Sequence, residues 1–132
     1  ALTALPIGLT TIDNGAFSKA NLSALTALPE GLTTIGFHAF NRATLSALTA
    51  LPEGLTTIGL YAFYSVQGLT LDSGLPTKVK SIGNNAFYEC HDLSVKALSD
   101  IYEINVQALD NDNIKRLEND SHGPKTSRSS AA

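Results

Sequence analysis

The sequence predicts a solenoid, in which one short structural unit is repeated along an axis and each copy packs on the next. Ala24–Gly36 returns almost letter for letter as Ala47–Gly59, and Ala1–Ile12 is an earlier copy. Each copy leads into Ala-Phe, and the phenylalanines recur at intervals of 23, 23 and 24 residues. They are Phe17, Phe40, Phe63 and Phe87. A fixed period of this length indicates a unit that buries its apolar face against its neighbours.

Within one copy, the residue pattern predicts short extended segments joined by turns. Leu22, Leu25 and Leu28 form an apolar ladder on a first segment, and Thr33–Ile35 suits extended backbone in a second. Phe37–Phe40 suits a single helical or 3-10 turn. Stacked coils place equivalent residues about 4.8 Å apart, which is the spacing of paired strands. We therefore expect each copy to form one coil of a parallel sheet, with the phenylalanines in a buried column.

Beyond Phe87 the repeat is expected to continue in degenerate form. Ile104–Leu109 keeps the frame I-x-x-x-A-(F/L), so Leu109 is expected in the phenylalanine column. A C-terminal helix across residues 101–109 is the alternative. Apolar and polar residues alternate from Tyr102 to Ala108, which favours an extended segment over a helix.

These observations define the expected domain organisation. We expect about five coils of 22–24 residues, with a leucine-rich solenoid over residues 1–117 whose last coil is degenerate and cap-like. Residues 118–132 contain almost no apolar side chains and are expected to form a flexible tail. The chain starts inside a repeat and has no Met, so it is interpreted as a fragment or a processed product.

Composition argues against several functions. The net charge of −3 argues against nucleic-acid binding, which requires a basic patch. No run of 18 apolar residues occurs, so no membrane insertion is expected. A single cysteine excludes an intrachain disulfide framework.

Catalytic and metal-binding patterns are absent from the sequence. His38, His91 and His122 occupy unrelated positions without the spacing of metal ligands. Asp110–Asn113 begins like a calcium loop but lacks its glycine and its final glutamate, so a polar turn is expected. No nucleophile–base pair, phosphate loop or dinucleotide motif appears. We expect no enzymatic activity, no catalytic residue, no cofactor and no metal.

The framework residues resemble a known repeat family. Leu28-Pro29, Leu32, Ile35-Gly36 and Ala39-Phe40 follow the pattern of the BspA-like, or treponemal-type, leucine-rich repeats. Cys90 stands three residues after Phe87, where that family often has a cysteine, and is expected to be a small buried filler.

The resemblance implies a function as well as a fold. It implies a leucine-rich-repeat solenoid from a secreted or cell-surface protein that adheres to a protein partner, such as a host extracellular-matrix or cell-surface protein. A structural spacer or a self-associating segment of a larger protein is a second interpretation. An effector scaffold secreted into a host cell is a third.

Candidate binding residues lie where the copies differ. Tyr and Arg are favoured at binding hot spots, and the variable positions on either side of Ala-Phe carry several of them. The candidates are His38, Arg42, Tyr61, Tyr64 and Tyr88. A second candidate surface is the sheet face, with small uncharged side chains suited to flat docking or lateral association. It carries Ser23, Thr26, Ser46 and Thr49. Taken singly, each of the five residues beside Ala-Phe is better explained as an ordinary solvent-facing side chain than as a binding residue.

Overall fold

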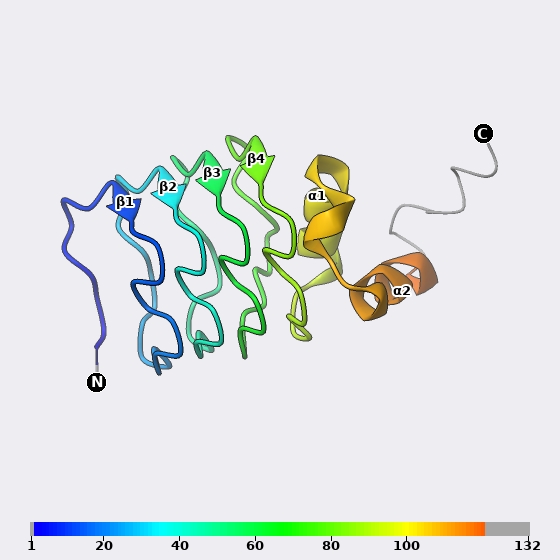
Figure 1. Cartoon of the computed structure of the whole chain (residues 1–132), viewed down its shortest axis with the longest axis horizontal. Helices are drawn as coiled ribbons and strands as arrows, with labels where there is room; N and C mark the ends of the chain where they lie inside the picture. Colours follow the sequence, from blue (N-terminus) through cyan, green and yellow to red (C-terminus); the bar gives the residue numbers. More distant parts are fainter. Residues whose placement is uncertain (1, 121–132) are drawn as a thin grey trace.

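The computed structural model describes residues 2–120, which form a row of stacked coils followed by a helical segment (Figure 1). Each coil contributes one two-residue strand to a parallel sheet whose order follows the chain. The strands are β1 (Thr11–Ile12), β2 (Thr34–Ile35), β3 (Thr57–Ile58) and β4 (Ser81–Ile82). Equivalent residues pair, with Ile12 beside Ile35 and Ile35 beside Ile58. The predicted solenoid of parallel coils is confirmed.

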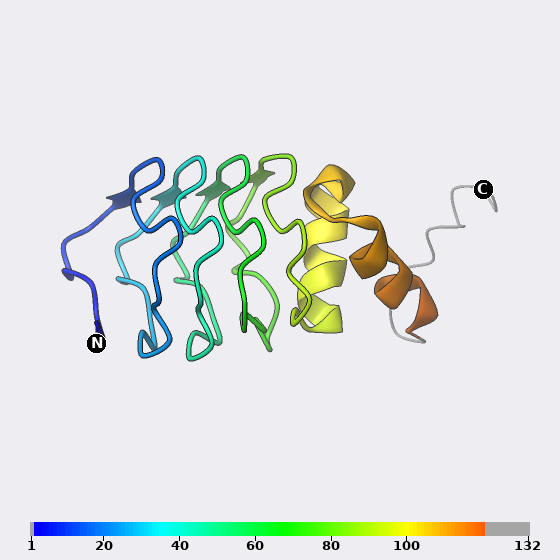
Figure 2. The ribbon, with the colours of Figure 1, turned by 60° about the horizontal axis from the view of Figure 1, so that its bottom comes forward.

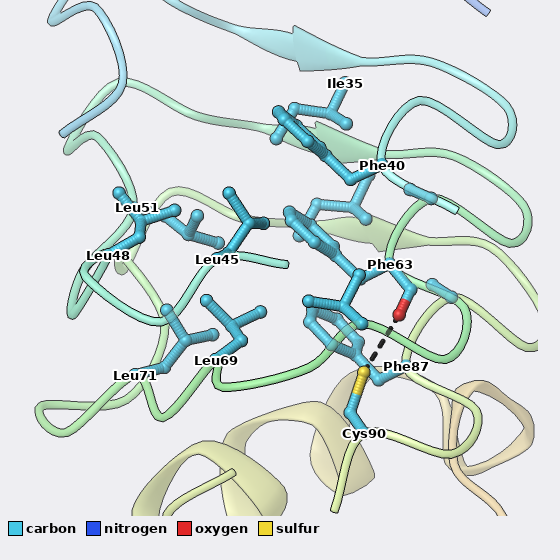
Figure 3. Close-up of a cluster of buried hydrophobic side chains, with 14 of the residues drawn as sticks. Ile35, Phe40, Leu45, Leu48, Leu51, Phe63, Leu69, Leu71, Phe87 and Cys90 are labelled. Carbon is cyan, nitrogen blue, oxygen red and sulfur yellow. Dashed lines mark hydrogen bonds between the residues drawn. The ribbon is translucent and has the colours of Figure 1, made fainter. Parts of the chain in front are cut away.

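The coil interior is filled by the predicted column of phenylalanines. The rings stack almost parallel, with centroids 5.5 Å apart for Phe17 and Phe40, 5.3 Å for Phe40 and Phe63, and 5.1 Å for Phe63 and Phe87. Figure 3 shows the rings of Phe40, Phe63 and Phe87 one above the other, beside the buried leucines. Phe17, at the N-terminal end of the stack, is only half-buried. Leu109, which was expected to continue the column after Phe87, is also buried.

The segments around each phenylalanine are hydrogen-bonded turns, so the helical turn predicted for Phe37–Phe40 is wrong. Two residues of each coil adopt left-handed backbone, as His38 (φ 59°) and Arg42 (φ 61°) do. Their N–H groups donate to the next coil, to Leu60 O at 3.0 Å and to Tyr64 O at 2.7 Å. A helical turn directs its N–H groups back along its own chain, so it would leave this ladder between coils unformed. The equivalent left-handed residues elsewhere are Gly15, Lys19, Tyr61, Ser65, Asn85 and Glu89.

The leucine ladder is buried but is not a strand, which corrects its expected place in the sheet. Leu22, Leu25 and Leu28 are all buried, whereas a strand would send residues three apart to opposite faces. The chain turns between them instead, and the Leu25 N–H donates to Leu22 O at 3.0 Å. Pairing along this side is limited to isolated parallel bridges, which join Asn21 to Thr44 and Thr44 to Gln67.

The glycine after each strand isoleucine allows the close stacking of coils. A Cβ built on Gly59 would lie 2.8 Å from the Gly36 carbonyl carbon and 2.9 Å from the Phe37 nitrogen. Backbone atoms at that distance cannot be avoided by rotating a side chain. Gly54, in the outer turn of the same coil, has open space by comparison, with its nearest neighbours 3.8 Å away. The two glycines therefore have different structural roles.

We expect Gly59→Ala to destabilise the protein by about 1–3 kcal/mol, because it overpacks the contact between adjacent coils. Gly54→Ala is the matched control, and we expect a change between neutral and about 1 kcal/mol stabilising, through the lower entropy of the unfolded chain. Urea unfolding of both variants measures the difference. Equal stability of the two variants would show that coil spacing does not require glycine at position 59.

The C-terminal segment is helical, and the prediction of an extended segment across residues 101–109 is wrong. It contains α1 (Val95–Ile104), the 3-10 helix η1 (Val106–Ala108) and α2 (Asn111–Asn119). The alternation from Tyr102 to Ala108 began inside α1 and was too short a window to show the helical period. The earlier residues Ala97, Leu98 and Ile101 have the spacing of a helix face and are fully buried.

The helical segment nevertheless keeps a hydrogen bond of the repeat. The Phe87 N–H donates to Ala108 O at 3.0 Å, as the Phe63 N–H donates to Ala86 O at 2.7 Å one coil earlier. In Figure 2, α1 stands against the last coil and α2 follows it at the end of the solenoid. The predicted boundary between residues 117 and 118 stays a prediction: α2 reaches Asn119, and residues 121–132 of the expected tail lie outside the described residues.

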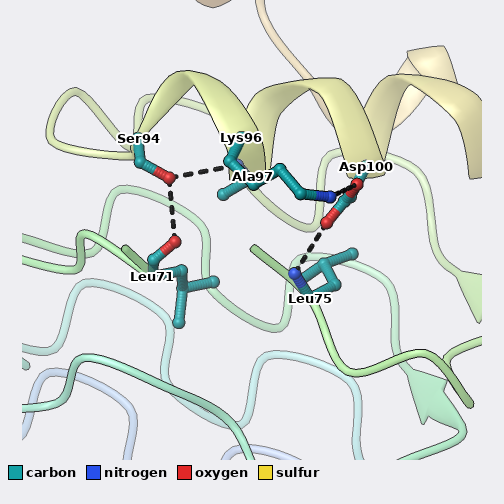
Figure 4. A network of polar contacts seen from close by, with 6 residues as sticks. All are labelled: Leu71, Leu75, Ser94, Lys96, Ala97 and Asp100. Carbon is teal, nitrogen blue, oxygen red and sulfur yellow. Dashed lines mark hydrogen bonds and ion pairs between the residues drawn. The ribbon is translucent and has the colours of Figure 1, made fainter. Parts of the chain in front are cut away.

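Polar side chains of Ser94 and α1 bond to the backbone at the start of the last coil. The Ser94 hydroxyl donates to Leu71 O at 2.8 Å, and an Asp100 carboxylate oxygen accepts the Leu75 N–H at 2.9 Å (Figure 4). Lys96 holds Asp100 in an ion pair of 2.7 Å. The same Ser94 hydroxyl caps α1 by accepting the Ala97 N–H. These bonds attach α1 to the backbone of the last coil.

Two further side chains replace backbone groups of the missing coil directly. Asn105 donates its amide to Ile82 O at 2.8 Å, where the preceding coil uses the Gly83 N–H to reach Ile58 O. Asp110 accepts the Glu89 N–H at 2.6 Å, and its other oxygen caps α2 by accepting the Asn113 N–H at 2.8 Å. The polar turn expected at Asp110–Asn113 is therefore a helix cap.

We expect Asp110→Ala to destabilise the protein by about 1–3 kcal/mol, because it leaves the Glu89 N–H without an acceptor and uncaps α2. Asn111→Ala changes the adjacent exposed residue and is expected to stay within about 0.5 kcal/mol of the parent. Thermal or urea unfolding of the two variants distinguishes them. A change as small in Asp110→Ala as in Asn111→Ala would rule out a capping role for this carboxylate.

Candidate functional site

Four of the five candidate residues predicted from the sequence lie together as a continuous row of rings across three coils. His38 stacks on Tyr61 with ring centroids 4.9 Å apart, and Tyr64 stacks on Tyr88 at 5.6 Å. Tyr61 and Tyr64 lie in one coil, 5.5 Å apart and tilted by 59°, and join the two stacks. We call these four residues the aromatic row.

The repeat holds the aromatic row in place through its backbone. His38 and Tyr61 occupy the same left-handed position in successive coils, and the N–H of each donates to the next coil. Tyr64 and Tyr88 both follow a column phenylalanine. Because equivalent positions stack at the coil spacing, aromatic residues placed there must also stack. The fold alone therefore fixes the position of the row.

The fifth candidate, Arg42, lies beside the row and is exposed. Its guanidinium carbon is 5.8 Å from the centre of the Tyr64 ring, within reach of a cation–π contact. Two apolar neighbours, Phe37 and Leu60, were not among the predicted residues although they precede His38 and Tyr61 directly. They are 44% and 46% exposed, and the Phe37 ring packs edge-on against His38 at 4.0 Å.

Charge changes sign along the solenoid beside this row. The left-handed position after each column phenylalanine is occupied in turn by Lys19, Arg42, Ser65 and Glu89. Lys19, Arg42 and Glu89 are exposed. The surface is therefore basic at its N-terminal coils and acidic at its last coil, with aromatic rings between them.

The second candidate surface is exposed but is not a sheet face. Ser23, Thr26, Ser46 and Thr49 are all exposed. They lie between the buried leucines of the turning segment, outside strands β1 to β4, so the prediction that they line the sheet is wrong. They present small side chains without the apolar or aromatic area found at the row.

The described residues contain no cluster that suggests metal chemistry. Across residues 2–120, no group of three or more His, Cys, Asp or Glu side chains could hold a metal ion. A polar hollow of about 150 Å³ beside Tyr88 and His91 is bordered by the α2 cap. Asp110 in its wall already accepts two backbone N–H groups. His122, the third histidine considered, lies outside the described residues.

Cys90 is the buried filler that was expected. Its side chain is fully buried, and its S–H donates to Phe63 O at 2.9 Å (Figure 3). Burial raises the pKa of this thiol far above its usual range, and nearby carboxylates raise it further. Because the thiolate is the nucleophilic form, Cys90 is unreactive in the folded protein.

A membrane-spanning helix is not found among residues 2–120, where every helix is too short and too polar to cross a bilayer.

Comparison with known proteins gives one result that bears on the whole chain. A family model described as a BspA type leucine-rich repeat region matches in six copies over residues 3–115. No curated protein and no solved structure gives a significant match. The matched span includes all four strands, the phenylalanine column and the aromatic row.

Proposed function

Because the chain belongs to the BspA-type leucine-rich repeat family, we propose that it is a non-enzymatic module that binds a protein partner through the aromatic row. The observation that carries this proposal is the continuous row of His38, Tyr61, Tyr64 and Tyr88 on an otherwise regular framework. Repeat families of this kind serve as protein-interaction modules, and a solenoid presents an extended surface suited to large partners.

The physical properties of the row favour binding over a purely structural role. Its rings are half-buried and held by stacking, so little side-chain entropy remains to be lost when a partner docks. Tyrosine and arginine supply large contact areas together with polar groups, which is why they are enriched at hot spots. Phe37 and Leu60 add exposed apolar area next to the rings.

We further propose that the protein acts in adhesion, at the cell surface or in the secreted state. Members of this family are usually secreted or surface proteins. A host extracellular-matrix or cell-surface protein is then the expected class of partner.

A structural or self-associating role is the second candidate. It is favoured by the near identity of Ala24–Gly36 and Ala47–Gly59, which leaves exposed Thr26 and Thr49 at equivalent sites. A surface that repeats itself is suited to lateral packing of copies. The exposed residues at these sites are small, however, and provide little area for a hot spot.

We expect Tyr61→Ala/Tyr64→Ala to weaken adhesion to immobilised extracellular-matrix proteins at least tenfold, because two central rings of the row are removed. The matched control is Thr26→Ala/Thr49→Ala, which truncates the other candidate surface and should bind like the parent. Circular dichroism confirms that both variants remain folded. Equal binding by the tyrosine variant, with loss in the threonine variant, would move the site to the second surface. Lack of adhesion by the parent, together with association of copies in ultracentrifugation, would favour the structural role.

A further inference from the structure

We infer that the aromatic row binds an extended, proline-rich segment of the partner in the polyproline II conformation, with acidic residues near Lys19 and Arg42 and a basic residue near Glu89. This inference rests on the proposed function and specifies the partner's chemistry. Three observations carry it: the engaged backbone under the row, the spacing of the rings, and the change of charge along them.

The backbone beneath the row has no free edge to which a partner strand could pair. The N–H groups of His38 and Tyr61 donate to Leu60 O and Asn84 O, and those of Arg42 and Ser65 donate to Tyr64 O and Tyr88 O. Addition of a β-strand depends on unpaired main-chain groups. Recognition must therefore come from side chains, as it does when a polyproline II segment docks on aromatic residues.

Ring spacing also favours polyproline II over an extended strand. Successive coils lie 5.3 Å and 5.1 Å apart at the phenylalanine column. Side chains on one face of a strand recur about every 6.6 Å, which matches neither one coil nor two. A polyproline II helix rises about 3.1 Å per residue with three residues per turn. One turn of the helix is therefore about 9 Å long, which is close to the distance across two coils. Residues i and i+3 of the bound segment would then contact His38 in the second coil and Tyr88 in the fourth.

The row supplies hydrogen-bond donors of the kind that such a segment needs. Polyproline II has no internal hydrogen bonds, so its carbonyl oxygens remain available as acceptors. Within residues 2–120, the hydroxyl groups of Tyr61, Tyr64 and Tyr88 have no hydrogen-bond partner. Each hydroxyl can donate to a carbonyl while its ring contacts a proline face. Each tyrosine can therefore contact both the apolar proline rings and the polar backbone of the bound segment.

Charge complementarity fixes the ends of the segment. Lys19 and Arg42 favour carboxylates at the N-terminal end of the row, and Glu89 favours Lys or Arg at the other end. Polyproline II segments can dock in either chain direction, because their faces are similar in both. The charges on the protein therefore decide which end of the segment lies over which coil, whatever its chain direction.

Synthetic peptides test this proposal on the whole chain. The first peptide has, from its N-terminus, two aspartates, six prolines and two lysines. The second has the same residues in reverse order. The third is the first peptide with its prolines replaced by alternating glycine and serine. The protein has four tyrosines and no tryptophan, and three of the tyrosines lie in the row, so its tyrosine emission reports on the site. We expect saturable binding of at least one proline peptide, at least tenfold tighter than the glycine-serine peptide.

Variants separate the rings from the charges. Tyr64→Ala should lower affinity at least tenfold, whereas Lys80→Ala, an exposed change beside β4, should have no effect. A fourth peptide carries aspartates at both ends of the prolines. The Glu89→Lys variant should bind this peptide at least threefold more tightly than the parent protein does.

Equal binding of the proline and glycine-serine peptides, or no binding of either, would overturn the proposal. If that result accompanies tyrosine-dependent adhesion to matrix proteins, the proposed function stands and the polyproline ligand is wrong. An unchanged affinity in Tyr64→Ala would also overturn the proposal, because binding would then occur away from the row.

Discussion

The hydrogen bonds that left-handed residues donate to the next coil hold this structure in register. Each coil places two residues in a region of backbone space that costs about 1–2 kcal/mol for a residue other than glycine. In return, the N–H groups of residues such as His38 and Arg42 join successive coils at 3.0 Å and 2.7 Å. The strands contribute only two residues each. The turns therefore hold the register together with the sheet, and the phenylalanine column fills the space that they enclose.

Two features of the molecule follow from this ladder. Any aromatic residue placed at a repeated turn position stacks on its equivalent, and this produces the row of His38, Tyr61, Tyr64 and Tyr88. The ladder also leaves unpaired backbone groups wherever it stops. At the C-terminal end, Asn105 and Asp110 satisfy such groups with side chains while helices cover the apolar end of the last coil. A terminal unit of this kind is what a repeat protein requires for a stable and soluble end.

The sequence predicted those parts of the structure that depend on repetition. The period placed Phe40 over Phe63 without any knowledge of local conformation, and the variable positions identified all four residues of the aromatic row. Predictions of local conformation were less successful. The residue types at Arg42 and Tyr61 do not indicate left-handed backbone, because the ladder between coils imposes it; the signal lies in Gly15 and Asn85, which occupy the same position as His38 and Tyr61 in other coils. The three-residue spacing of Leu22, Leu25 and Leu28 does not alternate, so it does not distinguish an extended segment from a series of turns.

The C-terminal helix was missed for a different reason. Its start is marked by Ser94 as a cap and by the helical spacing of Ala97, Leu98 and Ile101, whereas the alternation of apolar and polar residues that suggests a strand begins only at Tyr102. The repeat pattern does not indicate the capping residues Asn105 and Asp110. Their side chains take the place of backbone groups, and the earlier coils therefore have no side chain in the same role. Their role becomes visible only when the last coil is compared with the one before it.

Native-state hydrogen exchange of individual amides measures the ladder most directly. The N–H groups of Arg42 and Ser65 lie in turns at the surface, where ordinary loop amides exchange quickly. We expect both to exchange as slowly as the Gly59 N–H, which bonds between the strand ends, because opening either one requires two coils to separate. Exchange of Arg42 and Ser65 as fast as that of Lys78, an exposed turn residue, would show that the turns do not hold the coils in register.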